Sequence, residues 1–205
     1  MRWTTLGAGL VLIGGLVWNG VSAAAPAVGE EAPAFSGMAT NGETVTLESL
    51  RGKTVVLEWT NHQCPFVRKH YESGNMQKTQ AAATAEGTVW VSIIYSAPGK
   101  QGFVSAEEAT ELTKSRAASP SYVVLDPEGT IGRAYEARTT PHMFVIDPEG
   151  KLVYMGGIDD KPTSDQADIA AATNYVTAAL ADMNAGKPVA TPVSEPYGCS
   201  VKYAE

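Results

Sequence analysis

Cysteine is scarce in this sequence. The 205 residues contain only two cysteines, Cys64 and Cys199, which are too few for a small fold built on a disulfide framework. Two interpretations of the pair remain open. It is either one structural crosslink that ties the C-terminal tail to the body of the protein, or a redox pair that opens and closes.

Charge is also low, and basic charge is lower than acidic charge. Only 18% of the residues are charged, and 15 basic residues stand against 22 acidic ones, for a net charge of −7. This balance argues against nucleic acid and anionic lipid surfaces as partners. Because 44% of the residues are hydrophobic, the chain can bury one sizeable core, and we expect a single globular domain with tails.

Long apolar runs are missing after the N-terminus. Residues 6–21 form an apolar run behind Arg2 and lead into the small residues 22–25, which is the pattern of a signal peptide over residues 1–25. Trp18 and Asn19 interrupt the run, which leaves it short of the roughly 20 apolar residues of a membrane span. We therefore expect export to the periplasm or another extracytoplasmic compartment, without stable membrane insertion after cleavage.

Periodicity predicts an α/β fold with a mixed central sheet and helices on both faces. An Asn-Gly pair at 41–42 predicts a tight turn, and a capping box at Ser105 and Glu108 predicts a helix start. A last helix is expected from Ser164 to Gly186. The predicted strands, which are short, apolar and rich in β-branched residues, are 53–59, 88–95, 122–125, 143–146 and 151–155. The domain then spans 26–186, and the tail 187–205 carries Cys199.

Cys64 stands at a predicted helix start. Pro65 fits the first position of a helix, where its missing N–H costs nothing, so a helix should begin there, and the Gly-Asn pair at 74–75 should break or kink it. A cysteine at this position is a candidate nucleophile, because free N–H groups and the helix dipole stabilise its thiolate. The basic run at 68–70 is most simply a solvated helix face, and the alternative is that its charge favours the thiolate or attracts an anionic substrate group.

Two segments carry a family resemblance. L-E-W-T-N-H-Q-C-P-F-V at 57–67 resembles the strand-loop-cysteine segment of thioredoxin-like proteins, and T-T-P-H-M-F-V-I-D at 139–147 resembles their cis-proline segment. Over residues 29–183 the chain resembles the redoxin branch, which includes alkyl hydroperoxide reductases, thiol-specific antioxidant proteins and periplasmic thiol-disulfide reductases. With its terminal Y-G-C-S-V-K-Y, it is most similar to a group of exported bacterial redoxin-domain proteins.

The resemblance implies a thioredoxin-like fold and roles for particular residues. Cys64 is the expected catalytic nucleophile, and Glu58 matches the buried acid of thioredoxins that exchanges protons with the active-site thiols. Pro141 is expected to be cis, which leaves the backbone of Thr140 free to pair with an extended substrate. The other substrate-binding candidates flank the cysteine and the proline: Asn61, His62 and His142.

The sequence departs from two patterns of its relatives. Val67 occupies the position of the second cysteine of a C-x-x-C pair, and Leu57 and Asn61 replace the proline and threonine of the peroxiredoxin motif. By elimination, Cys199 becomes the candidate resolving cysteine. The expected activity is thiol-disulfide exchange or peroxide reduction without a cofactor, with a peroxide or a protein disulfide as substrate and an external dithiol protein as reductant.

Two alternatives come from other functional classes. His62, His142 and Cys64 together are donors that a soft metal accepts, and copper-delivery proteins of cytochrome oxidase assembly use a related fold. The absence of a second cysteine near Cys64 ranks this metal site lower. The other alternative is a redox-inert interaction domain with a static crosslink between Cys64 and Cys199.

Overall fold

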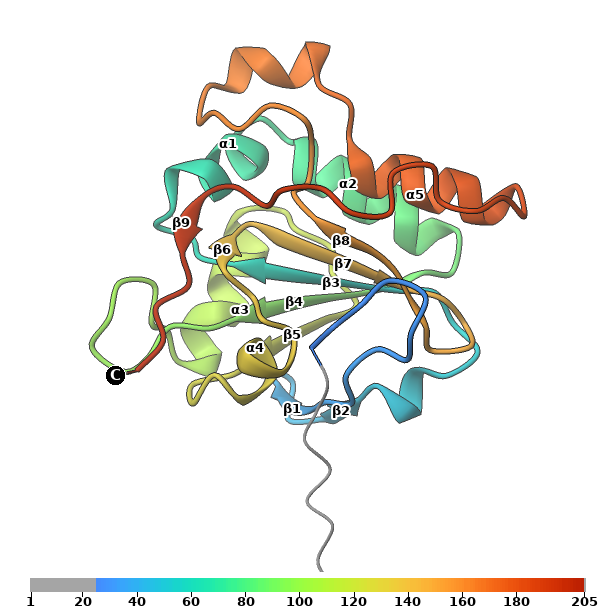
Figure 1. The fold of residues 1–205 in the computed structure, drawn as a ribbon. Helices are drawn as coiled ribbons and strands as arrows, with labels where there is room; N and C mark the ends of the chain where they lie inside the picture. Colours follow the sequence, from blue (N-terminus) through green and yellow to red (C-terminus); the bar gives the residue numbers. More distant parts are fainter. Residues whose placement is uncertain (1–24, 205) are drawn as a thin grey trace, which may run out of the picture.

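The computed structural model describes residues 25–204, which fold around one seven-stranded mixed sheet (Figure 1). The strand order is β2-β1-β5-β4-β3-β7-β8. Strands β3, β4 and β5 are parallel, whereas β7 lies antiparallel to β3 and β1 lies antiparallel to β5. The bounds are β1 Ser36–Ala39, β2 Thr44–Thr46, β3 Val55–Thr60, β4 Val89–Ile94, β5 Tyr122–Leu125, β7 His142–Ile146 and β8 Leu152–Gly156. The predicted fold class is confirmed.

Helices cover both faces of the sheet. In Figure 1, α1 (Pro65–Glu72), α2 (Asn75–Ala85) and α5 (Tyr175–Asn184) lie on one face, and the short α4 (Thr130–Ala134) lies on the other. Helix α3 (Ala106–Ser115) connects β4 to β5 and packs through Ala109 on Ile94 and Val123. Because successive strand residues face opposite sides, Leu57 of β3 points into the α4 side and Val56 into the α1 side.

Local signals located most element boundaries. The turn at Gly42 joins β1 to β2, the capping box at Ser105 starts α3, and β7 and β8 form the expected hairpin. Gly74 adopts a left-handed conformation after α1, as its predicted end requires. The chain then starts a further helix, α2, so the Gly-Asn pair breaks the predicted helix instead of kinking it.

The prediction of one last helix from Ser164 to Gly186 was wrong. The segment divides into a 3-10 helix, η2 (Gln166–Ala171), and α5, each with its own N-cap side chain. Asp165 accepts from the amide of Ala167, and Asn174 accepts from the amide of Thr177. No residue of η2 is buried, so its apolar side chains do not continue the core stripe of α5, and the two caps set separate starts.

The C-terminal tail crosses the sheet end that carries the cis-proline. The peptide bond between Thr140 and Pro141 is cis, as predicted. Strand β6 (Thr139–Thr140) pairs antiparallel with β9 (Cys199–Ser200) in a separate two-stranded ladder, and Figure 1 shows β9 lying between α1 and β6. Among residues 25–204, no helix is both long and apolar enough to cross a membrane. The predicted signal peptide falls almost wholly outside the described residues.

The capping box of α3 gives a direct test of the fold. Ser105 accepts from the amide of Glu108, whose side chain accepts from the amide of Ser105. We expect Ser105→Ala to lower the free energy of unfolding by about 1 kcal/mol, measured by urea denaturation. Ser36→Ala, at an exposed position of β1, is the control and should stay within about 0.5 kcal/mol of the parent. Equal values for the two variants would contradict the capping role.

Candidate active site

Cys64 is the N-cap residue of α1, at the end of the loop that follows β3. Asn61 shapes this loop, because its side chain accepts from the amide of Gln63 at 2.9 Å and donates to the carbonyl of Gln101 at 3.2 Å. The amide of Cys64 in turn donates to the carbonyl of Asn61 at 3.0 Å. Asn61 is buried, so its amide group is used to order the loop before the cysteine.

The Cys64 thiol faces the cis-proline segment and the tail. Its Sγ donates to the carbonyl oxygen of Thr140 at 3.1 Å, and the residue is fully buried. Cys199 lies directly opposite Thr140 in the β6–β9 ladder, and both cysteines are free thiols. The structure therefore brings together Cys64, Thr140, Pro141 and Cys199, residues that are up to 135 positions apart in the sequence.

The two thiols polarise one another. Burial alone raises the pKa of the Cys64 thiol, but hydrogen bonds from the Cys199 thiol, the Thr140 side chain and the amide of Val67 outweigh it, and the pKa is lowered overall. Burial raises the pKa of the Cys199 thiol, and its hydrogen bond to Cys64 raises it further. Cys64 is therefore the group that ionises first, and Cys199 is the proton donor beside it.

Gly198 allows the tail to approach the cis-proline segment. Its φ is +134°, and a Cβ at this position would collide with the carbonyl oxygen of Thr140. Only glycine combines this backbone conformation with such a close approach. The glycine of the Y-G-C sequence thus determines how closely Cys199 lies to β6.

Glu58 is buried on the α1 side of β3, as predicted. Its Oε1 accepts from the hydroxyl of Tyr71 at 2.8 Å, and its Oε2 accepts from Gln80 at 3.1 Å, from the indole of Trp90 at 2.9 Å and from Ser92 at 2.9 Å. These bonds satisfy a carboxyl group that would otherwise be costly to bury. Within residues 25–204, no hydrogen bond joins Glu58 directly to Cys64.

The two candidate histidines lie in different environments. His142 is buried, its Nδ1 accepts from the amide of Arg138 at 3.3 Å, and burial together with Arg138 lowers its pKa to about 3. His62 lines a cavity of about 350 Å³ with Tyr71 and Arg116. Among the described residues, no group of three or more His, Cys, Asp or Glu side chains is close enough to hold a metal ion. His62, His142 and Cys64 therefore do not form the donor set considered from the sequence.

Lys69, His70 and Asp159 are site residues that sequence reasoning missed. The basic run at 68–70 is not a solvated face, because only Arg68 is exposed, whereas Lys69 and His70 are buried and lie 3.7 and 3.9 Å from Asp159. These residues contact Tyr197, two positions before Cys199. The phase of the helix was a signal for His70 alone, since residues 67, 70 and 71 share one side of α1.

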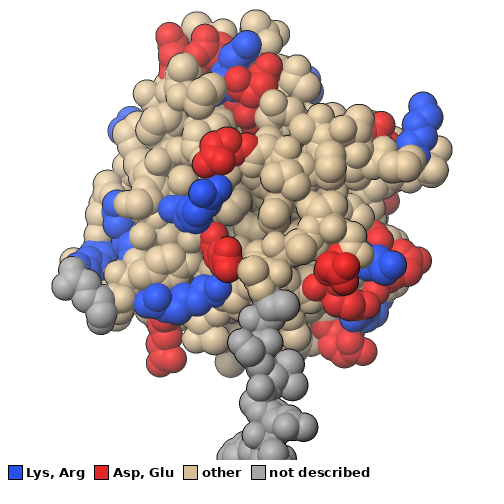
Figure 2. Space-filling model, viewed as in Figure 1, with Lys and Arg blue, Asp and Glu red and all other residues tan. Residues whose placement is uncertain are grey.

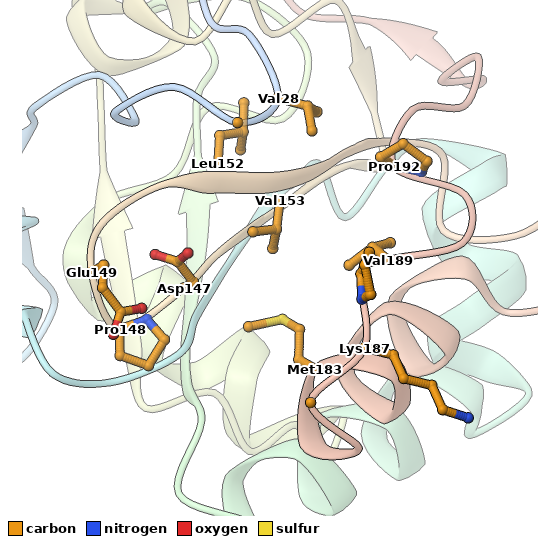
Figure 3. Close-up of a pocket in the computed structure, with 13 residues that line it drawn as sticks. Val28, Asp147, Pro148, Glu149, Leu152, Val153, Met183, Lys187, Val189 and Pro192 are labelled. Atoms are coloured by element: carbon orange, nitrogen blue, oxygen red, sulfur yellow. The ribbon is translucent and has the colours of Figure 1, made fainter.

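Other surfaces of the molecule lie away from this site. A groove of about 660 Å³ between the β7–β8 turn and the tail is lined by Leu152, Met183 and Val189 among others (Figure 3). It lies at the opposite end of β7 from Pro141 and contains neither cysteine. Figure 2 shows basic and acidic side chains interspersed over one face with broad uncharged areas between them, unlike the continuous basic stripe of a nucleic-acid binder.

Known proteins match most of this chain. The model of the AhpC/TSA family matches residues 28–155, which include Cys64 and the cis-proline segment. The chain belongs to the AhpC/TSA family. It is 30% identical over 156 residues to the thiol-disulfide oxidoreductase ResA of Bacillus subtilis, covering 70% of this chain and 78% of ResA. The strand β9 and Cys199 lie outside the residues that the AhpC/TSA model matches.

Solved structures share the fold of this AhpC/TSA protein. An uncharacterized conserved protein from Geobacillus kaustophilus superposes with a TM-score of 0.73 at 24% identity, over 87% of this chain and 93% of that one. The thioredoxin domain of a thiol-disulfide oxidoreductase from Bacteroides vulgatus superposes with a TM-score of 0.51 at 22% identity, over 71% and 96%. At these identities the likeness establishes the fold alone.

The hydrogen bond between the thiols predicts how the Cys64 pKa responds to substitution. Cys199→Ala removes the donor, so we expect the Cys64 pKa to rise above that of the parent. Cys199→Ser keeps a hydroxyl donor and should leave the Cys64 pKa closer to the parent value. The thiolate absorbance of the reduced proteins, followed in the ultraviolet against pH, measures the shift. Equal Cys64 pKa values in the parent and in Cys199→Ala would contradict the proposed hydrogen bond.

Proposed function

We propose that this protein is an exported thiol-disulfide oxidoreductase in which Cys64 is the nucleophile and Cys199 the resolving cysteine. The observation that carries the proposal is the pairing of β6 with β9, which holds the Cys199 thiol beside a Cys64 thiol of lowered pKa. The similarity to ResA supports disulfide exchange. The signal-peptide pattern of residues 1–25 supports export, and an oxidising compartment favours a disulfide cycle.

Two exchange steps complete the proposed reaction. The Cys64 thiolate attacks one sulfur of a substrate disulfide, forms a mixed disulfide and releases the other sulfur as a thiolate that takes up a proton. The Cys199 thiol then loses its proton, and its sulfur attacks Sγ of Cys64. The mixed disulfide breaks and the second substrate thiol leaves with that proton. The substrate disulfide gains two electrons, and Cys64 and Cys199 become a disulfide that an external dithiol protein reduces.

The Cys199→Ser variant tests this sequence of steps. We expect it to react once with a model disulfide and then to stall as a mixed disulfide at Cys64, because the second sulfur is missing. Stopped-flow kinetics with mass spectrometry of the trapped adduct measures both events, and Cys64→Ser, which should form no adduct, is the control. Turnover of Cys199→Ser at the parent rate with a dithiol donor would reduce the mechanism to a one-cysteine cycle.

Three further measurements separate the other candidate activities. Mixing with hydrogen peroxide in place of the disulfide would give a sulfenic acid at Cys64 if peroxide is the natural oxidant. A Cys64–Cys199 disulfide whose potential lies below about −300 mV would instead indicate a structural crosslink. Tight Cu(I) binding that disappears in His62→Ala and in His142→Ala would favour the copper-binding alternative.

Glu58 is the proposed proton-transfer group for the thiol pair. Glu58→Gln keeps the shape of the side chain and most of the buried network, because its oxygen can replace Oε2 and its nitrogen can donate to the Tyr71 hydroxyl, which already accepts from Gln80 at 3.2 Å. We therefore expect the fold to survive while disulfide exchange slows and its pH profile shifts. Exchange rates against pH measure the effect. An unchanged pH profile would assign Glu58 to packing alone.

A further inference from the structure

The tail is anchored two residues before Cys199 on a buried ion pair. The side chains of Lys69 and Asp159 are 0% and 2% exposed, and their charged atoms lie 3.7 Å apart. Lys69 also donates to the carbonyl of Lys161 at 2.8 Å. An ion pair this deeply buried stays favourable only when further hydrogen bonds satisfy its remaining polar atoms. Asp159 is only partly satisfied, since its Oδ2 has no hydrogen-bond partner.

Tyr197 supplies one of the bonds that Asp159 needs. The side-chain nitrogen of Asn75 donates to Nδ1 of His70 at 2.8 Å, so the proton of the neutral imidazole lies on Nε2. Nε2 then donates to the Tyr197 hydroxyl at 3.2 Å, and this hydroxyl donates to Oδ1 of Asp159. Burial lowers the pKa of His70 to about 4, which keeps the imidazole neutral in this chain of bonds.

The ring of Tyr197 is held as firmly as its hydroxyl. Phe66 packs edge-on against it with ring centroids 6.0 Å apart, and Nζ of Lys69 lies 5.6 Å from its centroid. On the other side, a Cβ at Gly157 would lie 3.2 Å from the ring. Helix α1 thus carries Cys64 at its N-cap and, within its next two turns, three side chains that contact Tyr197.

We propose that Tyr197 is a positioning residue for the resolving step, and that Lys69, His70 and Asp159 form the seat that holds it. This inference rests on the proposed function. The rigid helix α1 fixes the distance between Cys64 and the seat, and one residue, Gly198, separates Tyr197 from Cys199. Docking Tyr197 therefore places the Cys199 sulfur for attack on Cys64, and releasing Tyr197 withdraws it.

A second anchor explains why the tail stays attached when Tyr197 moves. Tyr203 donates to the carbonyl of Ala137 at 2.9 Å and packs on Tyr95, with Arg133 over its ring. The ladder between the two anchors has only two residue pairs. Because Cys64 is fully buried under this segment, a substrate disulfide reaches it only after the segment near Tyr197 moves.

The test uses Tyr197→Phe, which removes the hydroxyl and keeps the ring. In stopped-flow mixing with a model disulfide, we expect the first phase, attack by Cys64, not to slow. The second phase, closure of the Cys64–Cys199 disulfide, should slow about tenfold, in keeping with the loss of a hydrogen bond to a charged group. Tyr175→Phe, on α5 and outside the seat, is the matched control and should leave both phases unchanged.

A second background separates positioning from general damage. In a Cys199→Ser protein there is no second sulfur to deliver, so adding Tyr197→Phe should not slow the remaining phase. Two results would overturn the positioning role. One is slower attack by Cys64 in the double variant than in Cys199→Ser alone. The other is a rate of disulfide closure in Tyr197→Phe that stays within twofold of the parent rate. A parent protein whose Cys64 does not react with the disulfide would overturn the proposed function itself, and this inference with it.

Discussion

The pairing of Thr140 with Cys199 is the contact on which the site depends. A cis-proline leaves the backbone before it free to accept an added strand, and here the chain supplies that strand from its own C-terminus. This one short ladder covers Cys64, brings a second sulfur to the first, and explains the glycine at 198. Without it, Cys64 would be a lone cysteine at a helix start, with no partner among the remaining residues.

Burying polar groups against helix α1 is costly, and the structure offsets the cost in two ways. Glu58 receives four hydrogen bonds from side chains of α1, α2 and β4 and is fully satisfied. Asp159 is incompletely satisfied and depends on a tyrosine from the tail. The Glu58 network ties the sheet to its helices permanently. Asp159 ties the body to the tail segment around Tyr197, which must move, and is therefore better suited to control that segment.

The sequence predicted the features that neighbouring residues determine, such as helix starts, turns and the cis peptide. Pro65 located the start of α1 at Cys64, the Asn-Gly pair located the turn between β1 and β2, and the T-T-P segment indicated the cis peptide. It could not predict contacts between distant residues. The phase of α1 indicated a buried side for His70, but nothing in the sequence distinguishes Lys69 from a solvated lysine until α1 is placed over the loop with Asp159, 90 residues later. The split of the last helix was missed for a similar reason, since η2 has helical spacing but no core to cover.

Cys199 reaches Cys64 within one molecule, and this gives the tail an advantage over a substrate strand that competes for the backbone of Thr140. A tethered strand acts at an effective concentration on the order of millimolar, and its two tyrosine anchors add to that advantage. A two-residue ladder alone is marginal, so the two anchors keep the site closed together with the backbone bonds that flank the ladder, from the amide of Val201 to the carbonyl of Arg138 and from the amide of Ala97 to the carbonyl of Lys202. A substrate strand with only backbone pairing to offer would lose to the tail.

A substrate disulfide competes differently, because its capture by Cys64 is covalent and the mixed disulfide persists until Cys199 returns. The closed arrangement thus favours partners that react over partners that merely bind.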